Sequence, residues 1–308
     1  MILETDGASL AADPRGWRRL QIKGAPPRIG DDVLAALETA VAANDPTPIV
    51  IVSAAEAFAL GADLDQEIAA AVAGDLAPME AALVRYQAVM LAVQRSAVPV
   101  VAAVGAIAIS GGCELIMHCA GAAARREVPI GLREAYVGVV PGGGGLKELA
   151  RRAAEAALQD RQVALARAFA MVGTGRLRLA EEAQARGFMA ATPAVFTDGD
   201  VEAEAGRRAL ALRHGGYAPP PPRPIPIGGP AAFEALQGDL ARRAQRDGLT
   251  PHQVTIATEI ARILTAADLG ADAVDEQDLL ALEREAFARL LRTPETQAMI
   301  RQAMTIRR

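Results

Sequence analysis

The sequence predicts an α/β fold with a mainly parallel sheet, followed by an all-helical C-terminal extension. Short apolar runs typical of buried strands alternate with longer segments in which apolar residues recur at helical spacing. Hydrophobic residues form 51% of the 308-residue chain and charged residues 22%, a composition that supports a sizeable globular core. A proline-rich stretch separates the alternating part from a purely helical one.

The first half of the chain alternates strand and helix signals. The run Ile49-Val50-Ile51-Val52 is β-branched throughout, which is typical of a strand buried on both faces of a parallel sheet. Alternation of strands and helices in one order favours parallel pairing with helical crossovers. In order, we expect a strand at Trp17–Ile22, a helix at Val33–Ala43 capped by Asp31 or Asp32, a strand at Ile49–Val52, a helix at Pro78–Arg95, a strand at Val98–Val104 and a helix from Gly111 to His118.

The second half becomes mainly helical. The stretch Gly215–Pro230 contains seven prolines, which excludes a helix or central strand and predicts an extended spacer. A polyproline ligand for an SH3-type partner is the alternative. We expect short segments at Ala122–Arg125 and Val128–Ile130, a helix at Leu146–Leu158, helical signals to about Phe188, and helices at Ala231–Arg246, Thr250–Leu264 with Thr250 as cap, Glu276–Leu291 and from Pro294 onward. The chain thus divides into a core (1–192), a helix and proline-rich linker (193–230) and a C-terminal helical region (231–308).

Charge and cysteine content exclude several classes of function. The net charge is -5 and no long basic block is present, so a nucleic-acid partner is not expected. Cys113 and Cys119 lie six residues apart in one expected helix, a spacing typical of neither a metal site nor a disulfide. We therefore expect reduced, buried thiols and a cytoplasmic protein. The N-terminal residues lack the pattern of a signal peptide.

One uncharged stretch, Ser96–Cys113, is long enough to resemble a short membrane span. It contains Pro99 and three glycines, which suit a transmembrane helix poorly. A buried strand, a turn and the start of a helix explain the stretch better. We expect no membrane span.

Three local motifs carry chemical meaning. The segment 58–64, FALGADL, follows an expected buried strand, and the carboxyl ends of parallel strands are where α/β folds bind ligands. The segment 109–115, ISGGCEL, follows another buried strand and opens a helix, so its N–H groups can receive an anion or oxyanion. The third motif combines IGLRE at 130–134 with VVPGGGG at 139–145, where successive glycines indicate a loop that contacts a ligand or packs tightly.

The two glutamates of these motifs have ordinary alternative roles when each is considered alone. Glu114 lies in the first turn of a helix, where its charge suits the helix dipole. Glu134 would pass as a surface residue or as a partner of Arg133. Taken together, however, two carboxylates near two sets of exposed N–H groups suit proton transfer beside a polarised carbonyl.

The order and spacing of FALGADL, ISGGCEL, IGLRE and GVVPGGGG resemble the signature of the enoyl-CoA hydratase/isomerase (crotonase) superfamily. The match is close over about residues 45–190. The remainder, including DEQDLLALEREAF at 275–287, resembles the hydratase portion of bacterial 3-hydroxyacyl-CoA dehydrogenase/enoyl-CoA hydratase fusions, although no dinucleotide fingerprint is present in this chain.

This resemblance implies a ββα-spiral core and a CoA thioester substrate. It implies that Glu114 and Glu134 are catalytic and that the N–H groups of Leu60 and Gly111 form the oxyanion hole. The implied reaction is that of a lyase, the reversible addition of water to a trans-2-enoyl-CoA in fatty-acid β-oxidation, with no cofactor beyond the coenzyme A of the substrate and no metal. The residues implied to line the substrate are Ala59, Gly61, Ala62, Asp63, Gly142 and Gly143.

The sequence departs from the family pattern at several of these positions. Leu60 stands where a small alanine is common, Ser110 replaces the first of three glycines, and Ala120 stands where aspartate commonly follows the helix. Arg133 beside Glu134 is unusual, and its charge would lower the pKa of Glu134. The segment Pro26-Pro27-Arg28 also differs from the family's Asn-Ala segment.

Several alternatives remain open from the sequence. The chain could be an enoyl-CoA isomerase or another acyl-CoA enzyme built on the same oxyanion hole. It could also be a non-catalytic acyl-CoA-binding or scaffold subunit that partners a separate 3-hydroxyacyl-CoA dehydrogenase. The resemblance implies a homo-oligomer, a trimer or hexamer. His118 is expected to be packed in the core, and Cys113 lacks a histidine partner that would make it a nucleophile.

Overall fold

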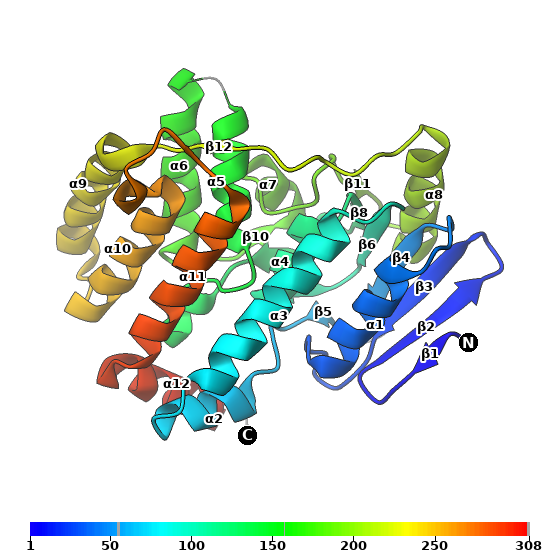
Figure 1. The fold of residues 1–308 in the computed structure, drawn as a ribbon, viewed down its shortest axis with the longest axis horizontal. Helices are drawn as coiled ribbons and strands as arrows, with labels where there is room; N and C mark the ends of the chain where they lie inside the picture. Colours follow the sequence, from blue (N-terminus) through cyan, green and yellow to red (C-terminus); the bar gives the residue numbers. More distant parts are fainter. Residues whose placement is uncertain (54–55, 157, 307–308) are drawn as a thin grey trace. The chain divides into compact units, whose positions relative to one another are not determined.

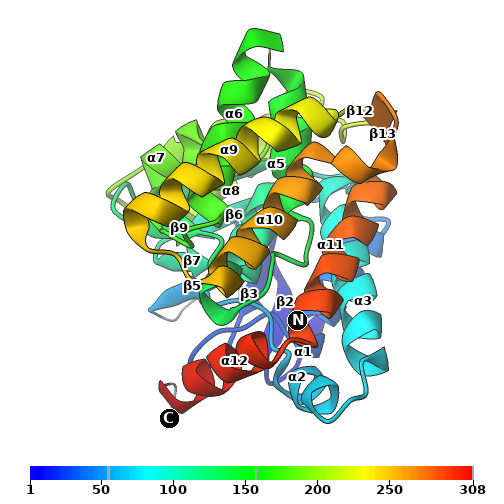
Figure 2. The same ribbon diagram turned by 90° about the vertical axis from the view of Figure 1, so that its left-hand side faces the viewer.

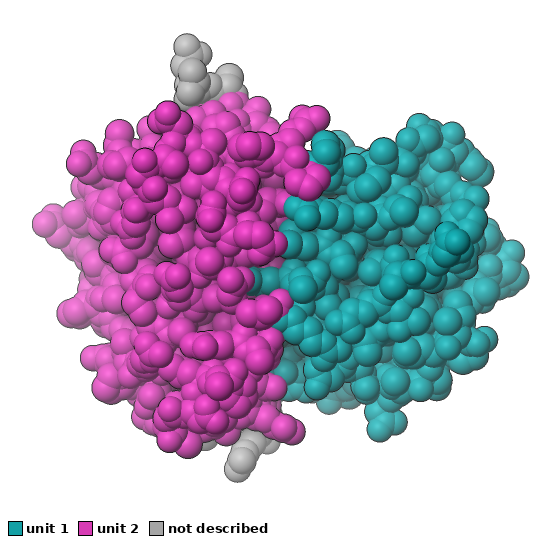
Figure 3. Space-filling view, viewed as in Figure 1, with its two compact units in different colours: residues 1–64, 85–131, 177–221 teal, residues 65–84, 132–176, 222–308 magenta. Residues whose placement is uncertain are grey.

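The computed structural model describes residues 1–53, 56–156 and 158–306 (Figure 1). These residues form two compact units, shown in different colours in Figure 3. The units do not follow the linear division expected from the sequence, because parts of the expected core group with the C-terminal helices. Unit 1 comprises Met1–Leu64, Arg85–Gly131 and Leu177–Pro221, and unit 2 comprises Asp65–Val84, Leu132–Arg176 and Pro222–Arg308.

Unit 1 contains two sheets. The first has the strand order β1-β2-β3-β4-β6-β8-β11, antiparallel from β1 to β3 and parallel from β3 to β11. The second has the order β10-β9-β7-β5, in which β5, β7 and β9 are parallel. The strands are β1 (Leu3–Glu4), β2 (Ala8–Asp13), β3 (Trp17–Ile22), β4 (Ile49–Ser53), β5 (Ala57–Ala59), β6 (Val100–Val104), β7 (Ile107–Ile109), β8 (Gly121–Ala124), β9 (Pro129–Gly131), β10 (Arg178–Leu179) and β11 (Val195–Phe196).

The chain follows the spiral that the family resemblance implies. The pairs β4 and β5, β6 and β7, and β8 and β9 each send their first strand to the seven-stranded sheet and their second to the four-stranded sheet. Helix α4 (Gly111–His118) follows the second of these pairs and contacts β5 and β7. This wiring places the motifs at 58–64 and 109–115 on neighbouring strands, because β5 pairs directly with β7.

Helix α8 (Val201–His214) covers one face of the seven-stranded sheet, packing against β4, β6 and β8 (Figure 1). Its Val201, Ala205 and Ala209 form a buried cluster with apolar side chains of the strands. Gly206 of this helix lies against the ring of Trp17, so close that a Cβ atom there would collide with the indole. Burial of such apolar surface is the main stabilising term of a fold of this kind. The remaining helices wholly in unit 1 are α1 (Asp31–Ala42) and α7 (Ala180–Ala185).

Unit 2 is mainly helical. Helix α10 contacts α5, α6, α9 and α11, and Figure 2 shows α9, α10 and α11 side by side. The short strands β12 (Ile225–Pro226) and β13 (Ala273–Val274) pair antiparallel. The helical elements are α2 (Asp65–Val72), η1 (Glu134–Val137), α5 (Gly145–Glu155), α6 (Leu158–Val172), α9 (Gly229–Asp247), α10 (Pro251–Thr265), η2 (Ala267–Leu269), α11 (Glu276–Leu291) and α12 (Pro294–Ile306), and α3 (Ala77–Gln94) crosses the boundary between the units.

Most expected elements are confirmed. The expected strand at Trp17–Ile22 and the helix at Glu276–Leu291 match exactly, and Thr250 caps α10 through a reciprocal capping box with Gln253. The expected helix over 146–158 ends earlier, with residue 157 outside the described part, and α6 begins at Leu158. Among the described residues, no helix is long and apolar enough to span a membrane.

The cap expected for α1 is wrong. The N-cap is Gly30, which offers no side chain, while Asp31 and Asp32 lie in the first turn. The carboxylate of Asp32 instead accepts a hydrogen bond of 2.8 Å from the N–H of Gly7. Both carboxylates still lie at the positive end of the helix dipole. The two aspartates therefore mark the start of α1 correctly, although neither caps it.

Candidate functional site

The start of α4 packs directly against the loop that follows β5. A Cβ atom on Gly111 would lie closer than 3.0 Å to the Tyr86 hydroxyl oxygen. It would lie 3.0 Å from the N atom of Ala62. A Cβ on Gly112 would come closer than 3.0 Å to the carbonyl oxygen of Ala59. The two glycines are therefore required for close approach of two main-chain segments. Gly111 and Gly112 thus pack against Ala59 and the 61–62 segment in unit 1, while the roles of these residues toward a substrate stay predictions.

The loop at 60–63 is also paired with the segment Pro27–Ile29. The N–H of Leu60 donates to the carbonyl of Pro27 at 2.9 Å, the N–H of Ile29 donates to Gly61, and the N–H of Asp63 donates to Ile29. Gly61 has φ of +105°, a conformation that glycine adopts without strain. The Leu60 N–H is therefore already engaged in this structure, and the role implied for it requires exchange of its bond to Pro27.

Two more contacts tie this segment to the loop. Arg28 and Asp63 form an ion pair with 3.1 Å between Nη1 and Oδ1. A Cβ atom on Gly30 would lie so close to the Cβ of Asp63 that little space remains for a side chain at position 30. Asp63, expected to line the substrate, is thus also a structural partner of the preceding segment.

Ser110 joins β7 to α4 with a strained backbone. Its φ is 54° and ψ is -125°, outside the regions that L-residues favour. The N–H of Ser110 donates to Gly131 at 2.9 Å, which fixes the entry to the helix. Such strained residues are held in place by surrounding structure and cluster at functional sites.

Glu114 is buried, with 3% of its surface exposed, although its side chain is ionisable. It lies in the first turn of α4, and its carbonyl oxygen is 2.7 Å from Nδ1 of His118 one turn later. His118 is itself buried, so the expectation that it is packed in the core is confirmed. A buried carboxyl group at a helix N-terminus is costly to place and is a candidate for a functional role.

Glu134 begins η1 in unit 2 and is also buried, with 8% of its surface exposed. The alternative of an ordinary surface residue is therefore wrong. Arg133 places its guanidinium 4.5 Å from the centre of the Tyr136 ring. Because Glu114 and Glu134 belong to different units, their expected convergence on one substrate stays a prediction.

The four-glycine motif of unit 2 meets a carboxylate from the C-terminal helices. Glu283 of α11, which is fully buried, accepts hydrogen bonds from the N–H of Gly144 at 2.7 Å and the N–H of Lys147 at 2.8 Å. A Cβ on Gly142 would come within 2.9 Å of the Leu83 side chain. At Gly142, tight packing is therefore the observed reason for glycine, and contact of Gly142 and Gly143 with a substrate stays a prediction.

A buried ionic cluster follows the same motif. Lys147 and Glu148 are fully buried, and their side chains pair at 2.7 Å. Arg151 and Arg152 also pair with Glu148, at 2.7 and 3.3 Å. Burial raises the pKa of Glu148, but the positive charges of Lys147, Arg152 and Arg151 lower it by more. The pKa of Glu148 therefore lies well below the usual range. No local pattern in the sequence predicts this cluster.

The two cysteines are free and buried, as expected. The Cys119 thiol lies 3.3 Å from the carbonyl of Leu115, and burial raises its pKa far above the usual range. A thiol in such a setting is not a nucleophile near neutral pH. Among the described residues, no three His, Cys, Asp or Glu side chains gather as a metal site.

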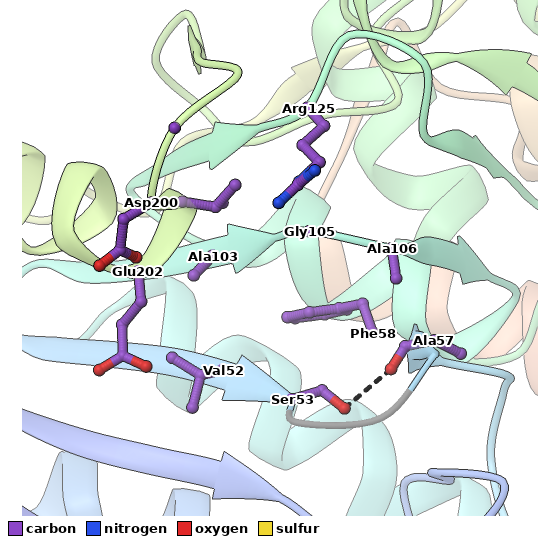
Figure 4. A pocket seen from close by; sticks show the side chains of 12 residues that line it. Val52, Ser53, Ala57, Phe58, Ala103, Gly105, Ala106, Arg125, Asp200 and Glu202 are labelled. Atoms are coloured by element: carbon purple, nitrogen blue, oxygen red, sulfur yellow. Dashed lines mark hydrogen bonds between the residues drawn. The ribbon is translucent and has the colours of Figure 1, made fainter.

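A cavity of about 260 Å³ in unit 1 lies elsewhere, beyond the carboxyl ends of β4 and β6 (Figure 4). Its acidic groups already have structural partners. Asp200 caps α8 by accepting from Ala203, and Glu202 pairs with Arg15 and Arg19. None of the residues expected to act on a substrate lines this cavity.

The contacts of three residues at these sites are not predicted by the sequence. Tyr86 lies in the middle of α3, where an aromatic residue indicates only a core position. Pro27 and Glu283 act through a carbonyl and a carboxylate that reach main-chain amides far away in the sequence. No local pattern predicts such long-range pairing.

Known proteins similar to this chain agree on one family. A model of the family "Enoyl-CoA hydratase/isomerase" matches residues 27–214, more than half of the chain. The chain is 28% identical over 258 residues to a "Probable 3-hydroxyacyl-CoA dehydrogenase" of Bacillus subtilis, covering 81% of this chain and 32% of that protein. It is 33% identical over 141 residues to a "Probable enoyl-CoA hydratase echA8" of Mycobacterium tuberculosis, covering 46% and 49%. The matches thus span half or less of these relatives.

Solved structures support the same fold. The chain resembles a carnitinyl-CoA dehydratase from Mycobacterium thermoresistibile with a TM-score of 0.69 and 18% identity, over 97% of this chain and 90% of the other. It resembles an enoyl-CoA hydratase from Rhodobacter sphaeroides with a TM-score of 0.67 and 20% identity, over 98% and 90%. The family match and the spiral of paired strands lead to one conclusion: the chain belongs to the enoyl-CoA hydratase/isomerase family.

Proposed function

We propose that this chain is an enoyl-CoA hydratase that reversibly converts a trans-2-enoyl-CoA to a 3-hydroxyacyl-CoA. The observation that carries the proposal is the junction of α4 with the 59–62 loop, where glycines bring main-chain amides together and Glu114 lies buried in the first turn. Amides at a helix start stabilise negative charge, which is what an enolate-like thioester oxygen requires.

In the proposed reaction, the hydroxyl of water bonds to C3 and a proton adds to C2 as the C2–C3 π bond breaks. Glu114 and Glu134 share the two proton transfers, one activating the water and the other supplying the proton. The N–H of Gly111 stabilises the charge that develops on the thioester oxygen, with the N–H of Leu60 once its bond to Pro27 is exchanged. The reaction needs no resident cofactor, because coenzyme A belongs to the substrate.

The decisive test is turnover of crotonyl-CoA by the wild type and by Glu114→Gln and Glu134→Gln. Each variant keeps the size of the side chain but removes the titratable group, so kcat should fall roughly 100- to 10,000-fold while substrate binding persists. Glu127→Gln, an exposed change in unit 1, is the matched control and should retain full activity. Equal rates for the wild type and Glu114→Gln would refute the proposal.

One observation favours a second function, that of a non-catalytic acyl-CoA-binding subunit. The N–H of Leu60, a donor that the family resemblance requires, is bonded to Pro27. In that case the wild type would bind acyl-CoA without turnover. Product analysis with a 3-enoyl-CoA separately distinguishes an isomerase, since only an isomerase moves the double bond without adding water.

Partners follow from the same proposal. One relative is named a 3-hydroxyacyl-CoA dehydrogenase, and the product proposed here is the substrate of such an enzyme. We propose a cytoplasmic homo-oligomer, a trimer or hexamer, or a complex with a separate dehydrogenase. Light scattering of the purified chain with and without a candidate dehydrogenase separates these assemblies by mass.

A further inference from the structure

The hydroxyl of Tyr86 lies beside the first residue of α4. It is the atom nearest to the position that a Cβ of Gly111 would take, closer than 3.0 Å, and the N atom of Ala62 borders the same position. Tyr86 is buried, with 3% of its surface exposed, and it extends from α3, a regular helix of 18 residues. Its polar end therefore reaches the junction from a rigid element.

Three groups near this point are able to donate a hydrogen bond: the N–H of Gly111, the N–H of Ala62 and the Tyr86 hydroxyl. The N–H of Gly111 begins α4 and has no acceptor within its own helix, because the first four amides of a helix lack one. The N atom of Ala62 borders the same space, and a phenol can donate its hydrogen to an acceptor. The N–H of Leu60, by contrast, is bonded to Pro27 at 2.9 Å.

We propose that the Tyr86 hydroxyl is a catalytic hydrogen-bond donor to the thioester oxygen and that, with the N–H of Gly111, it takes the role that the family resemblance implies for the N–H of Leu60. The inference rests on the proposed function, since it assumes an acyl-CoA thioester at this junction. The phenol keeps its proton and forms no covalent bond. It stabilises the charge that develops on the oxygen as water adds to C3, and releases that oxygen when the enolate is protonated at C2.

This role also explains why position 111 is a glycine. Any side chain there would displace the phenol, so glycine preserves both the N–H and the approach of the hydroxyl. A purely structural phenol would contribute packing and contacts within the protein, and its hydroxyl would not respond to a bound thioester. The two roles therefore differ in a property that can be measured without turnover.

The test compares Tyr86→Phe with Tyr217→Phe, the matched removal of a partly buried hydroxyl elsewhere in unit 1. With crotonyl-CoA, Tyr86→Phe should lower kcat roughly 100-fold with little change in KM, the loss typical of one oxyanion donor. Tyr217→Phe should match the wild type. The second readout is the absorption of 4-dimethylaminocinnamoyl-CoA, which moves to longer wavelength when its carbonyl oxygen accepts hydrogen bonds. Tyr86→Phe should bind this probe but shift it less.

The outcomes separate this inference from the proposed function. An active wild type with an equally active Tyr86→Phe and an unchanged probe shift overturns the role of Tyr86 alone. A wild type without turnover, whose probe shift is still reduced in Tyr86→Phe, overturns the hydratase and supports the donor. A wild type that binds no acyl-CoA overturns both.

A further measurement does not require the Tyr86 variant to fold. The chain has three tyrosines, so 3-fluorotyrosine labelling gives three fluorine signals, and the variants Tyr136→Phe and Tyr217→Phe identify that of Tyr86 by elimination. Saturation with butyryl-CoA, which cannot be hydrated, should move the Tyr86 signal. If butyryl-CoA binds and the signal stays in place, the hydroxyl does not contact the thioester and the inference fails.

Discussion

Two helices of this protein, α4 in unit 1 and α5 in unit 2, both begin at glycines. Different groups contact the N-termini of the two helices. At α5, Glu283 from α11 accepts hydrogen bonds from Gly144 and Lys147. At α4, the N-cap is Ser110, whose side chain makes no capping bond, and the adjacent groups are main-chain atoms of a loop and a phenol. At α5 a carboxylate from another helix binds amides of the first turn, while the nearest polar atoms beside Gly111 are the Tyr86 hydroxyl and the N atom of Ala62.

Comparing the two helix starts separates glycines needed for packing from glycines that could serve a ligand. Both helix ends attract negative charge, because their first amides and the helix dipole point the same way. Where a buried carboxylate of the same chain supplies that charge, the glycines serve packing and loop conformation. At α4 the carboxyl group in the first turn is Glu114, which we propose acts on the substrate, so we expect this helix end to stabilise charge that develops on a ligand.

The largest effect on stability is expected for Glu283→Ala. It removes the acceptor of two buried N–H groups, and an unsatisfied buried donor costs about 1–3 kcal/mol each, so the free energy of unfolding should fall by about 2–6 kcal/mol. Urea unfolding followed by circular dichroism measures the loss. Glu283→Gln, which retains one acceptor oxygen, should lose less.

Glu285→Ala is the control for this experiment. It makes the same change on the same helix, but its side chain is 62% exposed and pairs only with Arg289 at 3.8 Å. Its stability should stay within about 0.5 kcal/mol of the wild type. A Glu283→Ala variant as stable as Glu285→Ala would show that Glu283 does not hold the start of α5.

The ionic cluster at α5 should make stability depend on pH. The pKa of Glu148 is lower in the folded chain than its ordinary value of 4.5, so its contribution is fully present above about pH 4.5 and is lost as pH falls further. In that range, stability should drop by at most about 1.4 kcal/mol per pH unit for this one proton. Urea midpoints measured from pH 6 to pH 3 give the slope.

Glu148→Gln should flatten this slope because the variant has no proton to bind. Glu155→Gln is the matched control, since Glu155 pairs with Arg151 but its side chain is 65% exposed. It should leave the slope close to that of the wild type. A wild-type slope equal to that of Glu148→Gln would exclude Glu148 as its source.

The smallest effect is expected at the start of α4, for Ser110→Gly. The backbone conformation of Ser110 costs an L-residue about 1–3 kcal/mol, whereas glycine adopts it freely but loses about 0.4–1 kcal/mol through its more flexible unfolded state. The variant should therefore gain about 1 kcal/mol in the free energy of unfolding. Ser110→Ala, which removes the hydroxyl but keeps the strain, should gain nothing. A loss of stability in Ser110→Gly would contradict the strain.

Local patterns were sufficient for most of the fold. The β-branched run at Ile49–Val52 is strand β4, and the capping signal at Thr250 and Pro251 begins α10. Such elements are encoded by residues next to one another, so the sequence reveals them directly. The cap of α1 was missed because Asp32 bonds to Gly7, a partner 25 residues away. Whether an aspartate caps its own helix or accepts from a distant N–H depends on which backbone segment the fold brings beside it.

At the candidate site, too, local sequence patterns do not reveal which distant groups pair with each other. The amino-acid sequence was enough to predict the family and to single out the glycines of α4 and the two glutamates. The folded chain was needed to show that both glutamates are buried, that the N–H of Leu60 donates to Pro27, that Glu283 accepts from amides of α5 and that the Tyr86 hydroxyl lies beside Gly111. The physical reason is that a main-chain amide looks alike at every position in a sequence, and its partner is chosen by whichever acceptor or donor the folded chain brings within about 3 Å.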